Sequence, residues 1–231
     1  MNKLEIACFN LTSAVIAQEN GADRVELCAG FEVGGTTPSF ETTQKVRALI
    51  TIDLNVMIRP RGGNFAYTDA EFEQMKLEIT AFKKLKVNGF VFGILNEDNS
   101  INTIQNTELV NLAKPFPCTF HRAFDEVSNV FQSLEEIIEC GFQTVLTSGQ
   151  AKNVVDGSNQ LAELVSQANN RITIMPGGSL RAKNLKFIQE KTKATFYHSS
   201  AIIDGSETAN AVEIRALKSI LKWKTSSAKS L

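Results

Sequence analysis

The residues of this chain best suited to chemistry are two histidines that each follow a short apolar run. His121 lies in CTFHRAFD (118–125), beside Arg122 and Asp125, and His198 lies in FYHSSA. Imidazole and carboxylate groups suit proton transfer, and guanidinium groups suit anion binding. Each histidine is predicted at the point where a strand gives way to a helix. In α/β proteins, the carboxyl ends of parallel strands face the crevice where ligands bind.

A repeated junction indicates how the rest of the chain positions these histidines. A helix-like segment, then glycine, then an apolar run rich in β-branched and aromatic residues occurs at Gly21, Gly89 and Gly141. Glycine just past a helix can adopt the left-handed conformation that ends it, and the apolar run fits a strand buried on both faces. The repetition predicts β-α units in series.

Eight strands are predicted, with helical periodicity between them. They lie near Leu4–Ala7, Arg24–Leu27, Leu54–Arg59, Phe90–Leu95, Cys118–His121, Thr144–Thr147, Ile172–Met175 and Phe196–His198. Right-handed crossovers close such a series into a single (β/α)8 TIM barrel over residues 1–231, with a short Lys-rich tail from about residue 222. The alternative, an open doubly wound sheet, lacks a Gly-rich turn after its first strand, so no nucleotide cofactor is predicted.

Composition excludes several function classes. The 231 residues are 43% hydrophobic and 21% charged with a net charge of −1, which is typical of a globular protein and argues against binding to nucleic acid or a membrane surface. The first 21 residues match neither a signal peptide nor a membrane span, so a cytoplasmic location is expected. Four cysteines without a short-range pairing pattern are expected to be reduced thiols.

Strand alternation predicts which side chains point into the barrel, because successive side chains of a strand face opposite sides. Five polar residues then share the barrel mouth: Glu5, Glu26, Arg59, His121 and His198. The acids and histidines are the candidate catalytic residues, since carboxylates beside imidazoles can bring pKa values toward neutrality. Buried carboxylates need partners, and Arg59 and the histidines are available. A purely structural ion-pair network is the alternative.

Several segments favour an anion site at the same mouth. RPRGGNF contributes Arg59 and Arg61, whose guanidinium groups suit carboxylate or phosphate. Later loops add Gly- and Ser-rich turns in the positions where TIM barrels often bind phosphate. The candidate residues there are Ser148, Gly177, Gly178 and Ser199. Glycine and serine are also ordinary turn residues, and Arg61 can simply lie in solvent. One functional hypothesis is therefore an enzyme acting on a small anionic metabolite.

Seven segments together resemble the CutC family of copper homeostasis proteins, which is unrelated to the choline-cleaving radical enzyme of the same name. They are NGADRVELC, EVGGTTPS, MIRPRGGNF, TFHRAFD, VLTSG, MPGGS and HSSA, and they extend over nearly the whole chain. The resemblance implies a TIM barrel, a cytoplasmic location, a role in copper handling and a homo-oligomer. A copper ion is therefore a second expected partner.

Family copper proposals centre on cysteines, and Cys8 and Cys28 match the positions of interest. Thiolates are the soft ligands that Cu(I) prefers. Strand alternation speaks against a shared ion, because it turns Cys28 into the barrel and Cys8 toward the helices. Both can instead be small buried hydrophobes. Copper binding, an enzyme for a small anionic metabolite, and a noncatalytic binding or scaffolding barrel all remain open from the residues.

Overall fold

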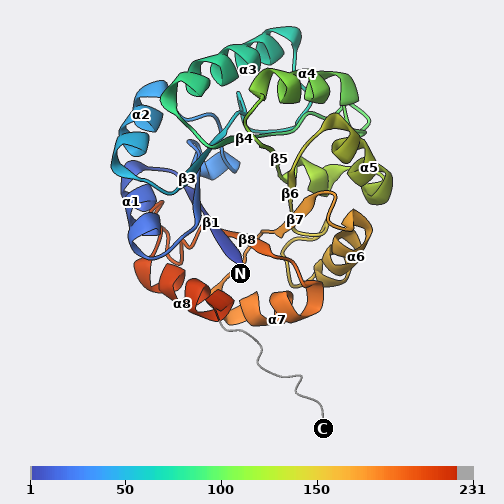
Figure 1. Cartoon of the computed structure of the whole chain (residues 1–231). Coiled ribbons are helices and arrows are strands. Elements are labelled where there is room, and N and C mark those ends of the chain that lie inside the picture. The colour runs from blue at the N-terminus through green and yellow to red at the C-terminus, as the bar shows by residue number, and fades with distance from the viewer. Residues whose placement is uncertain (1, 223–231) are drawn as a thin grey trace.

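Eight parallel strands alternate with eight α-helices along the chain in the computed structural model, which describes residues 2–222 (Figure 1). The strands are β1 (Lys3–Cys8), β2 (Arg24–Leu27), β3 (Asp53–Met57), β4 (Gly89–Phe92), β5 (Cys118–Phe120), β6 (Thr144–Thr147), β7 (Thr173–Pro176) and β8 (Phe196–Ser199). The helices are α1 (Leu11–Glu19), α2 (Phe40–Leu49), α3 (Asp69–Phe82), α4 (Thr103–Ala113), α5 (Val130–Cys140), α6 (Ser158–Ala168), α7 (Ala182–Thr192) and α8 (Ala211–Lys222). Apart from Lys222, the predicted Lys-rich tail lies outside the described residues.

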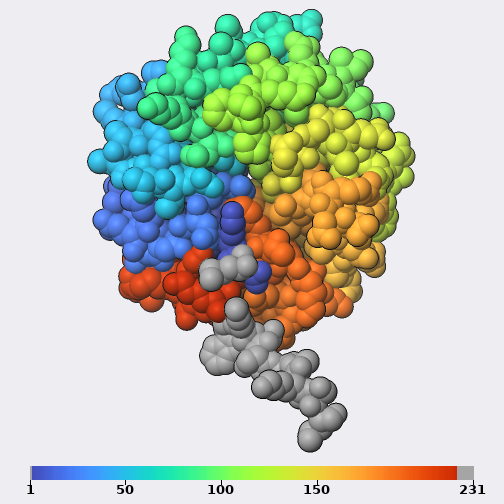
Figure 2. Space-filling view, viewed as in Figure 1, coloured from blue at the N-terminus to red at the C-terminus, as the bar shows by residue number. Residues whose placement is uncertain are grey.

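The strands pair in the order β7-β6-β5-β4-β3-β2-β1-β8, so the last strand joins the first. Strands β7 and β8 are also neighbours, and the ring of strands is surrounded by the ring of helices (Figure 1). The predicted TIM barrel is confirmed. Figures 1 and 2 look along the barrel at the end where β1 begins, in dark blue at the centre of the face. The carboxyl ends of the strands lie at the opposite end.

Three strands end earlier than predicted, and one of them, β5, does so by the single residue His121. Strand β3 stops at Met57 because the backbone amide of Arg59 donates to the Thr37 hydroxyl (2.9 Å) instead of to a neighbouring strand. Strand β4 stops at Phe92, and Leu95 instead bonds the Phe65 carbonyl (2.9 Å) in the preceding loop. The loops after β3 and β4 are therefore tied to one another rather than to the sheet.

Alternation along the strands separates two packing zones. Val25 and Leu27 of β2 belong to the large core between strands and helices, whereas Cys28 packs with Met57 and Val91 in a small cluster inside the barrel. The helices complete the outer core with their apolar faces. Helix α3, for example, begins with a capping box formed by Thr68 and Glu71 and buries Phe72, Met75, Ile79 and Phe82.

Candidate active site at the barrel mouth

A cavity of about 400 Å³ lies at the carboxyl ends of the strands. Seven of the twelve site residues predicted from the sequence line it: Glu26, Cys28, Arg59, His121, Gly178, His198 and Ser199. Apolar side chains, including Phe9, Phe31 and Phe65, form part of the wall. Such a cavity, mostly apolar with a few convergent polar groups, is typical of sites for small molecules.

Glu5 lies fully buried below this cavity, between two basic side chains, those of His198 and Arg24. Its Oε1 is 2.7 Å from His198 Nδ1, and its Oε2 accepts from Arg24 Nε. Burial alone would raise the pKa of Glu5, but the Arg24 guanidinium and His198 together hold it at about 2. Arg59 and the histidines were the partners expected for the buried acids; His198 does pair with Glu5, whereas Arg59 bonds backbone carbonyls instead. Arg24, which precedes Glu26 by two residues and lies on the same face of β2, is the second partner of Glu5.

Glu26 has a different environment, although it is only one strand away. It is 3% exposed, its Oε2 is 3.8 Å from His198 Nε2, and its Oε1 has no hydrogen-bond partner. Burial raises the pKa of Glu26 to about 7; the charge of Glu5 adds to this, and His198 opposes it. Burial would lower the pKa of His198, but Glu26 and Glu5 raise it. Two neighbouring carboxyls thus have well separated pKa values, as acid/base sites require.

Arg59 is buried, and both of its terminal nitrogens are occupied by the backbone. Its Nη1 donates to the carbonyls of Val33 and Gly35 (2.8 Å each), and its Nη2 donates to that of Gly63 (2.9 Å). Its guanidinium also lies over the Phe65 ring, 4.8 Å from the centroid. The Nε atom is buried without a partner. Arg59 therefore holds the loops after β2 and β3 together and offers the cavity at most two N–H groups, the one on Nε and the second one on Nη2.

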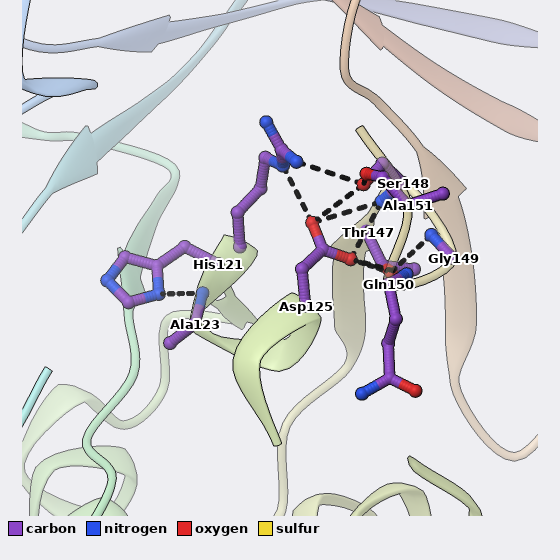
Figure 3. Close-up of polar contacts among 9 residues, drawn as sticks. His121, Ala123, Asp125, Thr147, Ser148, Gly149, Gln150 and Ala151 are labelled. Atoms are coloured by element: carbon purple, nitrogen blue, oxygen red, sulfur yellow. Dashed lines mark hydrogen bonds and ion pairs between the residues drawn. The ribbon is translucent and has the colours of Figure 1, made fainter. Parts of the chain in front are cut away.

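His121 is buried at the cavity wall in a form that can donate a hydrogen bond. Its Nδ1 accepts from the backbone amide of Ala123 (3.4 Å), as the dashed line in Figure 3 shows. Its Nε2 has no partner. Burial, with the charge of Arg59, lowers the pKa of His121 to about 3, so the ring is neutral near pH 7. Since Nδ1 accepts, the proton lies on Nε2.

Three predicted anion-binding residues do not line the cavity. Arg61 donates to Glu71 (2.6 Å) at the start of α3 and to the Ala66 carbonyl (2.8 Å), because the chain turns outward after Pro60. The Ser148 hydroxyl donates to the Ala151 carbonyl (2.6 Å). Gly177 lies behind His198, where an added Cβ would be 3.1 Å from the Cβ of that histidine. The sequence predicted that these three residues contact an anion directly, but none of them lines the cavity.

The loop after β6 passes so close to Gly157 that this residue must be glycine. A Cβ there would lie 1.9 Å from the Ser148 carbonyl oxygen. We expect Gly157→Ala to lower the free energy of unfolding by about 1–3 kcal/mol, since the backbone must shift to admit the methyl group. Urea unfolding measures the loss. Gly205→Ala is the control, because nothing lies within 4 Å of its Cβ position. Equal stability of the two variants would contradict this expectation.

Two arginines that line the cavity were not predicted as site residues from the sequence. Arg122 was noted only as a neighbour of His121, and Arg181 was not noted at all. Arg181 donates to the Ile202 carbonyl (2.6 Å) and reaches the hydroxyls of Ser199 (3.3 Å) and Ser200 (3.4 Å). It therefore fixes the loop after β8. Its position directly before the helix that follows the Gly-rich loop after β7 is the signal that could have identified it.

The two candidate copper ligands lie on opposite faces of the strand layer. Cys8 is packed in the core toward the helices, with its Sγ 3.5 Å from the Ile6 carbonyl, whereas Cys28 lines the cavity. Burial, together with the Glu26 carboxylate, raises the pKa of both thiols well above the usual range. The arrangement does not fit a shared dithiolate site. Among the described residues, Glu5, Glu26 and His198 form a group whose ligand atoms lie within 4.8 Å of one another.

A comparison with known protein families identifies the chain. The model of the CutC family matches residues 2–203. The chain belongs to the CutC family. A CutC protein of Parabacteroides distasonis is 47% identical over 199 residues, which cover 86% of this chain and 82% of the relative. The human copper homeostasis protein cutC homolog is 43% identical over 198 residues, covering 86% and 72% of the two chains.

Solved structures agree with this family assignment. The CutC protein of Streptococcus agalactiae superimposes with a TM-score of 0.83 at 34% identity, covering 87% of this CutC family member and 99% of that chain. Phosphoribosyl anthranilate isomerase of Thermotoga maritima matches with a TM-score of 0.64 at 13% identity, covering 96% and 99%. The second likeness shows the barrel fold alone. Within residues 2–222, no helix has the length and apolarity needed to cross a bilayer.

Proposed function

We propose that this CutC family member binds a small anionic metabolite in the barrel mouth and transfers a proton on it, with Glu26 as the acid/base group. One observation carries the proposal. Five buried side-chain nitrogen or oxygen atoms lack a hydrogen-bond partner among residues 2–222, and three of them belong to one cavity: Glu26 Oε1, Arg59 Nε and His121 Nε2. Buried polar groups are nearly always paired, so such a cluster supports a polar ligand that completes them.

The chemistry of these groups supports proton transfer. With its pKa raised to about 7, first by burial, Glu26 can both accept and return a proton near neutral pH. Neutral His121 can donate Nε2–H to a ligand oxygen and stabilise negative charge that develops there, without carrying a charge of its own. A base beside a neutral hydrogen-bond donor suits removal of a proton next to a carbonyl group.

The experiment combines binding with isotope exchange. A panel of phosphate- and carboxylate-bearing metabolites is screened for a saturable rise in melting temperature, and each hit is incubated in D2O and followed by NMR. We expect deuterium incorporation with the native chain and a rate at least about 100-fold lower with Glu26→Gln. Glu108→Gln, on the exposed side of α4, is the control. Binding without exchange would favour a noncatalytic binding barrel, and the absence of any hit would overturn the proposal.

Copper binding is a second candidate, supported by the names of the relatives and by the Cys28 thiol in the cavity wall. Cys28 would supply the soft sulfur donor that Cu(I) prefers, beside the nitrogen and oxygen donors of His198 and Glu26. Cys8, which faces the helices, would not contribute.

Single cysteine variants test this candidate. We expect Cys28→Ser to weaken Cu(I) binding at least tenfold in anaerobic competition with a Cu(I) chelator, and Cys8→Ser to leave it unchanged. Equal losses in both variants would restore the dithiolate hypothesis, and the absence of stoichiometric Cu(I) binding by the native chain would remove copper as a ligand. The cytoplasmic location and the homo-oligomer stay predictions.

A further inference from the structure

We propose that Arg122 binds the oxyanion group of the ligand, a carboxylate or a phosphate, and that Asp125 positions Arg122 for this task. The inference rests on the proposed function only in placing an anionic ligand in the mouth. It assigns a role to the two residues of CTFHRAFD that the acid/base chemistry leaves unused.

Arg122 is the first residue of the short 3-10 helix η3 (Arg122–Glu126), directly after β5 and His121. Its Nε donates to Asp125 Oδ2 (2.7 Å), and its Nη2 donates to the Ser148 hydroxyl (2.9 Å). The guanidinium is thus held at two of its three nitrogens. The third, Nη1, has no partner among residues 2–222, and Arg122 lines the cavity. A guanidinium fixed in this way loses little conformational entropy when it binds an anion.

Asp125 is built into the barrel as an anchor for this guanidinium. Its side chain is 9% exposed. Its Oδ1 accepts from the Thr147 hydroxyl (2.5 Å) and from the amides of Ser148 (3.0 Å) and Gln150 (3.2 Å). Figure 3 shows the Asp125 carboxylate directed at the loop after β6, away from His121. The donors to Asp125 Oδ1 thus come from the loop after β6 and not from the helix that follows Asp125.

Gly178 keeps the other side of the guanidinium open. It has φ +114°, which favours glycine, and a Cβ at this position would lie 3.6 Å from Arg122 Nη1 and 2.9 Å from the Ser148 Cβ. The wall beside Nη1 is therefore bare backbone from the loop after β7. An oxyanion at this point could accept from Nη1 without displacing a side chain.

The other arginines of the cavity are less suited to this role. Both terminal nitrogens of Arg59 donate to backbone carbonyls, and so do both of Arg181. The Arg122 side chain is 45% exposed, and an ion pair that solvent reaches contributes little stability, so the stability of the pair does not explain why the loop after β6 holds the Asp125 carboxylate with three donors. Positioning of Arg122 does account for it.

Inorganic phosphate and malonate are the probes, titrated into the full chain by calorimetry at pH 7.5. We expect Arg122→Gln to raise the dissociation constant at least tenfold for the probe that binds. Arg171→Gln should leave it unchanged, because Arg171 has the same 45% side-chain exposure and also pairs with a carboxylate, Glu135, but does not line the cavity. Phosphate and malonate separate a phosphate-bearing ligand from a carboxylate-bearing one.

A double-mutant cycle tests the positioning role of Asp125. Asp125→Asn should weaken probe binding in the native background and have no further effect in the Arg122→Gln background, whereas a general loosening of the loop would weaken binding in both. Ser148→Ala replaces Asp125→Asn if the latter does not fold. Unchanged probe affinity in Arg122→Gln would overturn this inference and leave the proposed function intact. Failure of both probes to bind the native chain would overturn the inference, while the metabolite screen decides the proposed function separately.

Discussion

Replacing Arg24 with methionine should lower the free energy of unfolding by about 3–5 kcal/mol, because it leaves a buried carboxylate without its main cationic partner. Glu5 is 0% exposed and its Oε2 pairs with Arg24 Nε. The Arg24 guanidinium also donates to Met175 Sδ (3.6 Å) and lies over the Phe196 ring, 4.1 Å from its centroid. Methionine loses these charge-dependent contacts but fills part of the same space. The expected loss is therefore electrostatic rather than a packing defect.

Urea unfolding at pH 7.5 measures this loss against two controls. Lys45→Met removes an exposed ion pair with Glu41 and should cost far less, because solvent screens the two charges. The double variant Arg24→Met/Glu5→Gln should regain much of the stability, since it also removes the Glu5 carboxylate that Arg24→Met leaves without its partner. A loss in Arg24→Met no larger than that in Lys45→Met would show that Glu5 does not depend on Arg24.

Glu26→Gln should change the pH dependence of stability between about pH 5 and pH 7. The pKa of Glu26 is raised, first by burial, to about 7 in the folded chain, against 4.5 ordinarily. In this window the folded state binds a proton that the unfolded state has released. The contribution of Glu26 to stability is thus fully present below about pH 4.5 and is lost as pH rises through 7. Glutamine cannot titrate and lacks this dependence.

The quantity to measure is the difference in free energy of unfolding between the native chain and Glu26→Gln. We expect it to fall by about 1 kcal/mol per pH unit from pH 5 to pH 7. The difference is needed because His121, whose pKa is lowered to about 3 by burial and by Arg59, adds a slope of opposite sign to both proteins below about pH 6.5. Parallel stability curves would contradict a raised pKa for Glu26.

The part of the site that follows from strand geometry could be predicted from the sequence. Alternation within a strand is local, and it correctly turned Glu26, His121 and His198 into the barrel mouth. It also separated Cys28 from Cys8, whose side chains lie in different packing clusters. Recognition of family motifs agreed with the barrel already predicted from the repeated β-α units, but it did not add the contacts of any side chain.

The contacts that depend on loops could not be predicted. Arg59 binds carbonyls of Val33, Gly35 and Gly63, whose positions are set by the loops after β2 and β3 rather than by any periodicity. The Asp125 carboxylate, likewise, bonds the loop after β6 and not its own helix, because the turn at Ser148 brings backbone amides to it. Nearly every residue type has the same backbone N–H and C=O groups, so the sequence does not indicate which of them will bond these side chains.

The pairing of β8 with β1 has a consequence for when the site comes into existence. The contact between Glu5 and His198 joins residues 193 positions apart, and it can form only after the last strand has closed the ring. During synthesis from the amino end, Glu5 and Glu26 are made long before His198, the imidazole that lies beside both of them. The cluster of two carboxyls and one imidazole is therefore complete only when β8 has paired with β1, and a chain that ends before β8 lacks it.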